Sequence, residues 1–214
     1  MGNAIEVARW FYKNNEQVKT DSKEGNVVVQ KLCYYVQAMC LAVLGKPLFD
    51  DTIEAWKEGP VIQNVYKPYR WYTDLLRVLN EKSISKEEEL ILKVVNSVYG
   101  YKTSDELTKN THSEFPWKQF KETASDKNYN PEITIDCIKE YYKGLADVYE
   151  ANKENDFENE RIYSLRNCNF AYNKNNIKNI TAYKEKLLEI ARQQSEAKSF
   201  NVFMDENGEL VIYE

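Results

Sequence analysis

The longest apolar segment of the chain lies at residues 27–44 and predicts a central helix. Apolar residues recur along it in two stripes at helical spacing, and a helix that is apolar on most sides belongs in the middle of a bundle. Gly45 stands where a helix C-terminus is expected. Residues 32–44 are too few to span a bilayer, so we expect a buried core helix. Tyr34 and Tyr35 are neighbours on this helix, and we expect one in the core and the other nearer the surface.

Helix N-termini are predicted at four other places by residues that can cap a first turn. Ser85 and Thr103 are each followed three residues later by glutamate, which is the spacing of a capping box. The helix after Thr134 is expected to be long, because Ile138 and Tyr149 share one apolar face with the residues between them. The four predicted caps are Asn3, Ser85, Thr103 and Thr134.

A turn-rich region follows the central helix. Residues 52–56 are predicted to form a short strand or extended segment. A sharp break follows at Gly59, and Pro60 suits the first position of a new helix. Val65 and Tyr69 would lie on the inner face of that helix.

The composition changes in the last third of the chain. Residues 152–179 are rich in Asn, Glu and Lys and carry few apolar anchors, so they are predicted to form an irregular crossing segment. A further helix follows, and Asn207-Gly208 then signals a terminal hairpin. A two-residue turn would place Met204 opposite Val211. Such a two-stranded ribbon must pack on the domain or on a partner.

Together these elements predict a mainly α protein. Residues 1–150 would form a compact helical domain with a small extended or β element. Residues 151–214 would form a C-terminal extension with an irregular segment, a helix and a terminal β-hairpin. A length of 214 residues fits one domain with a large appendage.

The net charge of −5, from 29 Lys and Arg against 34 Asp and Glu, argues against a protein that coats nucleic acid or anionic membrane. It is compatible with a basic protein partner. Residues 160–186 carry a local excess of positive charge with interleaved aromatics, a mixture that can bind RNA or DNA. The same mixture is more typical of a solvated helix face and loop. Aromatic residues make up 13% of the chain, and the excess of Tyr among them is also typical of a recognition surface.

Residues able to do chemistry are few. His112 is the single histidine, and the sequence identifies no Ser, Cys or carboxylate partner for it, so acid–base catalysis is not expected. The cysteines have no zinc-ligand spacing and are predicted to be free thiols. They are Cys33, Cys40, Cys137 and Cys168. With no phosphate loop or nucleophile elbow, we expect no catalytic residue, no metal and no cofactor. The N-terminus has no signal-peptide pattern, so we expect a cytoplasmic protein.

Three segments resemble the motifs of one known family. Residues 31–37, with the sequence KLCYYVQ, are similar to its first motif. The second motif is matched by Gly45-Lys46-Pro47-Leu48-Phe49, Ile53-Glu54-Ala55-Trp56, Gly59-Pro60-Val61 and Val65-Tyr66. The third is matched by Thr111-His112 with Pro116-Trp117. In order and spacing, residues 1–150 resemble the Panacea antitoxin domain, a family of phage-associated proteins also called SocA-like or GepA-like.

The resemblance implies an antitoxin from a bacterial or prophage toxin–antitoxin pair, which neutralises a cognate toxin by direct protein–protein binding. The SocA member implies an alternative, a proteolysis adaptor that delivers its toxin to a cellular protease. A nucleic-acid-binding regulator that uses residues 160–186 is a third hypothesis, which the acidity of the whole chain disfavours. The C-terminal hairpin is expected to supply partner-specific contacts or to pair two copies into a homodimer by its exposed edges.

The partner-binding site is predicted on the second and third motifs. Gly59 supplies backbone freedom and Pro60 fixes φ, so this turn could form a rigid platform that presents aromatic side chains. The alternative is an aromatic side chain packed under a tight turn, and both can hold at once. His112 is predicted to be a loop histidine beside Trp117 or a partner contact. The candidate partner-binding residues are Trp56, Gly59, Pro60, Val61, Tyr66, Tyr69, Trp71, Thr111, His112 and Trp117.

Overall fold

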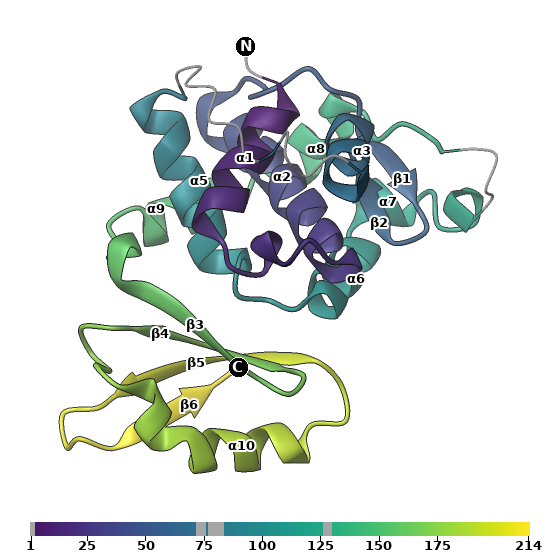
Figure 1. The fold of residues 1–214 in the computed structure, drawn as a ribbon. Helices are drawn as coiled ribbons and strands as arrows, with labels where there is room; N and C mark the ends of the chain where they lie inside the picture. Colours follow the sequence, from purple (N-terminus) through teal and green to yellow (C-terminus); the bar gives the residue numbers. More distant parts are fainter. Residues whose placement is uncertain (1–2, 72–75, 77–83, 126–129) are drawn as a thin grey trace.

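The computed structural model describes residues 3–71, 76, 84–125 and 130–214. A helical unit is followed along the chain by a small sheet with one covering helix (Figure 1). The protein is mainly helical, although its described part holds more strand than the sequence predicted. The elements of the helical unit are α1 (Ala4–Asn14), η1 (Val18–Thr20), α2 (Lys23–Leu44), β1 (Glu54–Trp56), β2 (Gly59–Val61), α3 (Gln63–Trp71), α5 (Lys86–Tyr99), α6 (Ser104–Ser113), α7 (Phe115–Lys118), η2 (Thr123–Ser125), α8 (Ile135–Tyr141) and α9 (Leu145–Asn152).

Helix α2 runs through the middle of the helical unit and is longer than the apolar segment that predicted it. It is capped by Ser22 and ends at Gly45, which adopts a φ of 70°. By length and composition alone it could cross a membrane, but 78% of its apolar window is buried inside the protein. Residues 32–44 alone are too few to span a bilayer, as expected, but the whole helix to which they belong is long enough, and its role as the buried core helix is confirmed.

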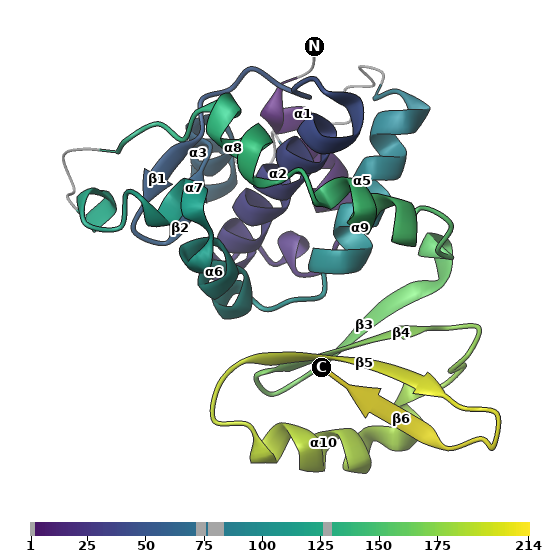
Figure 2. The same cartoon turned by 180° about the vertical axis from the view of Figure 1, so that it is seen from behind.

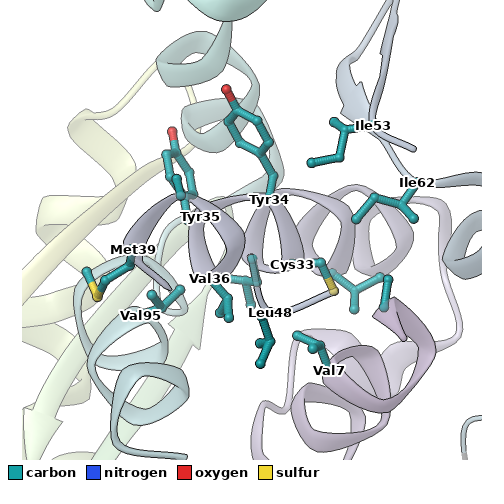
Figure 3. Close-up of a cluster of buried hydrophobic side chains, with 14 of the residues drawn as sticks. Val7, Cys33, Tyr34, Tyr35, Val36, Met39, Leu48, Ile53, Ile62 and Val95 are labelled. Carbon is teal, nitrogen blue, oxygen red and sulfur yellow. The ribbon is translucent and has the colours of Figure 1, made fainter. Parts of the chain in front are cut away.

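Tyr34 and Tyr35 are both buried, which corrects the expectation that one would lie near the surface. They rise from the same side of α2 (Figure 3), and their rings lie 5.7 and 6.2 Å from that of Tyr142. The Tyr35 hydroxyl donates to Glu114 Oε1 over 3.0 Å, and the Tyr142 hydroxyl donates to Oε2 of the same carboxylate. Because other elements cover α2 on most sides, even adjacent residues of this helix are buried.

Two buried glutamines of α2 hold neighbouring loops in place. Gln37 donates to the Phe49 carbonyl over 2.8 Å and accepts from the Leu48 amide over 2.9 Å. Gln30, two turns earlier, accepts from the Ile62 amide over 2.8 Å. An unpaired buried amide would cost free energy, so each glutamine favours one loop geometry. The loops that carry the second motif are thus positioned by α2.

The predicted helix caps are confirmed. The capping boxes at Ser85 and Thr103 begin α5 and α6, with both reciprocal hydrogen bonds formed. The side chains of Asn3 and Thr134 cap α1 and α8. These ends depend on contacts within four residues, which is why the sequence alone predicts them.

The last helix predicted for the helical unit is interrupted. α8 ends at Tyr141 and α9 begins at Leu145, because Tyr142 leaves helical geometry with φ −94° and ψ 21°. Ile138 and Tyr149, on either side of the break, are buried as predicted. The interruption therefore turns the chain without exposing its apolar face.

Gly59 and Pro60 lie in a strand rather than at the start of a helix. β1 and β2 pair in antiparallel fashion, with Ala55 opposite Pro60. The Ala55 amide donates to the Pro131 carbonyl on its other side. Pro60 therefore occupies a pair position at which no amide donor is needed. α3 begins at Gln63, so the prediction that Pro60 opens this helix is wrong.

The end of the chain forms a four-stranded sheet, which corrects the irregular segment predicted over residues 152–179. The strand order is β3-β4-β5-β6, antiparallel except for the parallel pair β4–β5. Helix α10 joins that parallel pair and covers the sheet face turned away from the helical unit (Figure 2). Phe170 and Phe200 stack with centroids 5.4 Å apart and share one buried cluster with Leu187 of α10. The elements are η3 (Phe157–Asn159), β3 (Glu160–Leu165), β4 (Cys168–Asn173), η4 (Ile180–Tyr183), α10 (Lys184–Gln193), β5 (Lys198–Met204) and β6 (Leu210–Tyr213).

The terminal hairpin forms, but its register differs from the predicted one. Met204 pairs with Leu210, so five residues, 205–209, separate the strands. The Asp205 carboxylate accepts from two amides of the turn, over 2.9 and 2.8 Å, and so closes a longer loop than the two-residue turn predicted. The prediction that Met204 faces Val211 is therefore wrong. The expectation that the ribbon packs on other structure is confirmed, because β5 also pairs with β4.

Polar contacts join the sheet to the helical unit. The Ser199 amide donates to Glu106 Oε1 over 2.9 Å, and the Asn169 side chain donates to the Tyr101 carbonyl over 2.9 Å. Each unit has its own buried hydrophobic cluster. A cleft of about 860 Å³ rich in asparagine lies between them. The domain boundary near residue 150 stays a prediction.

Candidate functional site

The second and third motifs meet around Trp117. This residue of α7 is buried, and its Nε1 donates to the Trp56 carbonyl over 2.8 Å. The His112 ring stacks on the Trp117 indole, with centroids 3.8 Å apart and planes inclined by 13°. His112 lies in the last turn of α6 and not in a loop as predicted. Two segments far apart in the sequence thus form one site beside the β1–β2 hairpin.

The β1–β2 turn lies tightly against α2 and α6. Gly59 has a φ of 100°, and a Cβ there would lie 2.7 Å from Lys31 Cε and 2.8 Å from Thr111 Oγ1. Both the backbone conformation and the space therefore require glycine. Lys31 Nζ donates to the Pro60 carbonyl over 3.1 Å. The rigid turn expected at Gly59 is thus held by Lys31, for which the sequence predicted no separate role.

Lys31 is the most unusual side chain of the site, since it is only 1% exposed. Burial lowers the pKa of its ammonium to about 7, and the nearby Glu58 carboxylate offsets part of that effect. Near neutral pH the side chain therefore exists in both charged and neutral forms. The sequence signal for a buried lysine here is a charged residue inside an apolar segment. Periodicity alone cannot separate such a lysine from one that reaches solvent along its stem.

Three aromatic residues, Trp56, Tyr66 and Trp71, lead from the turn to the surface, and we call them the aromatic row. The rings of Trp56 and Tyr66 lie 5.0 Å apart, and those of Tyr66 and Trp71 lie 6.1 Å apart at 88°. Trp56 and Tyr66 are half-buried, whereas Trp71 is 61% exposed. Glu54 fixes the inner end by accepting from Trp56 Nε1 over 2.7 Å. An exposed, well-anchored aromatic surface is typical of protein interfaces.

The other predicted site residues lie mostly beneath this surface. Tyr69 is buried, and its hydroxyl donates to the Val18 carbonyl. Thr111 is also buried, and its hydroxyl donates to backbone carbonyls of its own helix. These side chains support the site from below. The buried members of the predicted set are Gly59, Pro60, Val61, Tyr69, Thr111 and Trp117, and the accessible ones are Trp56, Tyr66, Trp71 and, in part, His112.

The His112 ring is packed against other side chains rather than freely exposed to solvent. Its Nε2 is buried and has no hydrogen-bond partner among the residues that the structure describes. Burial lowers its pKa and the Lys31 charge lowers it further, whereas Glu58 raises it.

Within the described ranges, no group of three or more His, Cys, Asp or Glu side chains could hold a metal ion. All four cysteines are free thiols, and Cys137 alone among them is only half-buried.

The comparison with known families bears directly on this site. The family model described as "Antitoxin SocA-like, Panacea domain" matches residues 29–118. This part of the chain is therefore similar to a SocA-like Panacea domain. The match begins within α2 and ends with α7, so it includes Lys31, the β1–β2 hairpin, the aromatic row and the His112–Trp117 stack. The resemblance expected over residues 1–150 is confirmed for this narrower range.

No curated protein and no solved structure matches the chain. α1, α8 and α9 lie outside the Panacea match, yet all three pack on α2. The helical unit is therefore larger than the matched segment. The four-stranded sheet also lies outside the matched residues.

Proposed function

We propose that this chain is an antitoxin that binds a cognate toxin directly and blocks it without catalysis. The observation that carries the proposal is the match to an antitoxin domain over the residues that build the aromatic row. Trp and Tyr bury a large area on binding at little cost in side-chain entropy. Trp71, at 61% exposed, offers such an area.

The framework beneath the aromatic row supports this role. The hydrogen bond from Trp117 to the Trp56 carbonyl and the stacked His112 ring hold the inner end of the row in one place. A surface that is ordered before binding loses less entropy when the complex forms. We propose that this occurs in the cytoplasm and needs no cofactor.

The test is co-expression with the protein encoded by the neighbouring gene, read out by growth and by co-purification. We expect that protein to be toxic alone, and we expect this chain to restore growth and to co-purify with it. Trp71→Ala should weaken both effects, because it removes the most exposed member of the row. Tyr141→Ala is the matched control, since Tyr141 is 45% exposed but lies on α8, outside the Panacea match.

The outcomes separate the remaining hypotheses. A neighbour that is neither toxic nor bound would overturn the antitoxin proposal. Rescue that requires a host protease and is accompanied by falling toxin levels would instead support the proteolysis adaptor. Binding of nucleic acid that weakens steeply with salt would favour the regulator. Thermal unfolding of each variant shows whether a loss of function reflects a loss of fold.

A further inference from the structure

A cavity of about 140 Å³ lies beside the aromatic row, between the start of α2, the β1–β2 turn and α3. Its walls include apolar groups of Val27, Trp56, Val61 and Tyr66. Lys31 also lines it, and this lysine is almost wholly buried. The cavity is therefore an apolar recess that contains a potential cation.

The charges around this cavity have the opposite sign to the chain as a whole. Lys23, Lys57 and Arg70 line it together with Lys31, and Glu58 is the one carboxylate among its lining residues. No ion pair within the described ranges neutralises any of the four cations. The whole chain, by contrast, has a net charge of −5. A recess with walls of low dielectric focuses such a local field, so it attracts an anion.

The Lys31 ammonium has hydrogen-bonding capacity to spare. Its charged form carries three N–H donors. The Pro60 carbonyl accepts from it over 3.1 Å, and no second acceptor is found in the part of the chain that the structure describes. A buried cation with unused donors is costly. Because Lys31 lines the cavity, an anion that enters can supply the missing acceptor.

The size of the cavity decides what kind of anion fits. Pockets for small-molecule ligands usually measure about 300–1,000 Å³, which is well above the 140 Å³ found here. A cavity of about 150 Å³ holds a group the size of benzene. The recess therefore suits a single amino-acid side chain better than a metabolite.

We propose that this cavity receives one acidic side chain, Glu or Asp, of the partner protein, whose carboxylate pairs with the Lys31 ammonium. The inference rests on the proposed function, because it requires a protein partner. The methylene carbons of the acidic residue pack against Trp56 and Tyr66, and Trp71 contacts the partner surface around it. The acidic charge of the whole chain favours a basic partner at long range. The cavity selects an acidic residue at short range.

This pairing makes binding depend on pH. The charged and titratable groups around Lys31 and its cavity are Glu58 and Lys57 in the turn, Lys23 on α2, His112 on α6 and Arg70 on α3. The carboxylate binds the charged lysine, so above pH 7 the complex must take up a proton to form. Affinity should therefore fall by up to roughly 50-fold between pH 7 and pH 9.

The experiment measures the dissociation constant between the full chain and the neighbour-encoded protein by calorimetry at pH 7, 8 and 9. We expect Lys31→Met to bind at least tenfold more weakly than the wild type at pH 7 and to lose the pH dependence. The variant should fold, because it removes a buried charge without changing the length of the side chain greatly. Lys46→Met, a lysine outside the cavity, is the matched control.

An alanine scan of the partner's Asp and Glu residues completes the test. One of these substitutions should weaken binding as much as Lys31→Met does, and the two together should weaken it no further. If the wild type binds and Lys31→Met binds equally at every pH, the cavity proposal is overturned while the antitoxin proposal stands. If the wild type does not bind at all, both are overturned. Self-association of this chain that Lys31→Met abolishes would assign the cavity to a second copy and would also overturn the proposal.

Discussion

Replacing Lys31 by methionine should make the protein more stable at neutral and acidic pH. A pKa of about 7 in place of 10.5 corresponds to a cost of roughly 5 kcal/mol for folding with the charged form buried, at about 1.4 kcal/mol per pKa unit. Methionine fills a similar space without a charge. Loss of the hydrogen bond to the Pro60 carbonyl offsets about 1–2 kcal/mol of that gain. At pH 6 we therefore expect Lys31→Met to raise the free energy of unfolding by about 3 kcal/mol.

The gain should disappear as the pH rises. Between pH 7 and pH 10.5 the unfolded wild-type chain binds more protons at Lys31 than the folded chain does, so wild-type stability increases with pH. At pH 9 the remaining cost in the wild type is about 2 kcal/mol. The difference between variant and wild type should therefore shrink by about 3 kcal/mol from pH 6 to pH 9.

Urea unfolding followed by tryptophan fluorescence measures this difference, because every tryptophan of the chain lies in the helical unit. Titrating groups that do not interact with Lys31 cancel when variant and wild type are compared at the same pH. Lys57→Met is the control, since Lys57 is exposed on the neighbouring turn and its substitution removes no buried charge. A Lys31→Met variant that is less stable at pH 6, or whose difference stays constant with pH, would refute the reasoning.

Three further predictions concern the framework and the sheet. Gly59→Ala should cost more than about 2 kcal/mol, because its φ is 100° and its Cβ would meet the lysine beneath it; an unchanged melting temperature would contradict this. Trp117→Phe should cost about 1–2 kcal/mol by leaving the Trp56 carbonyl without its donor, and it should weaken partner binding; unfolding and binding assays check both effects. Deleting residues 200–214 removes most of β5, a strand that is paired on both sides, and should unfold the sheet. Tyr213→Ala on the edge strand β6 should leave the circular dichroism spectrum unchanged. A change in the oligomeric state of that variant would therefore report a role of this edge in dimerisation.

Helix caps and the family motifs could be predicted from the sequence because they depend on nearby residues. The Ser85 and Thr103 caps, and the left-handed Gly45 that ends α2, each satisfy backbone groups within one turn. The motifs also predicted which segments would carry the candidate site. Trp56 and His112 were both expected there, and the structure brings them together through Trp117.

The sheet could not be predicted in the same way. Cys168 pairs with Lys198, thirty residues later and in parallel, across a helix. Nothing in the polar sequence of residues 152–179 identifies that distant partner. A parallel pair depends on the packing of α10 as much as on either strand. Local propensity therefore indicated an irregular segment where the fold forms two strands.

The sequence by itself determined the helix caps, the buried α2 and the motifs that resemble the Panacea domain, because these follow from periodicity and short-range hydrogen bonds. Only the tertiary structure decided which motif residues face solvent. Tyr69 and Thr111 are buried beneath the site, and Trp71 is exposed at the surface. Lys31 is a buried cation beside a cavity. The physical reason is that burial is a property of what packs around a residue, and those neighbours come from distant parts of the chain.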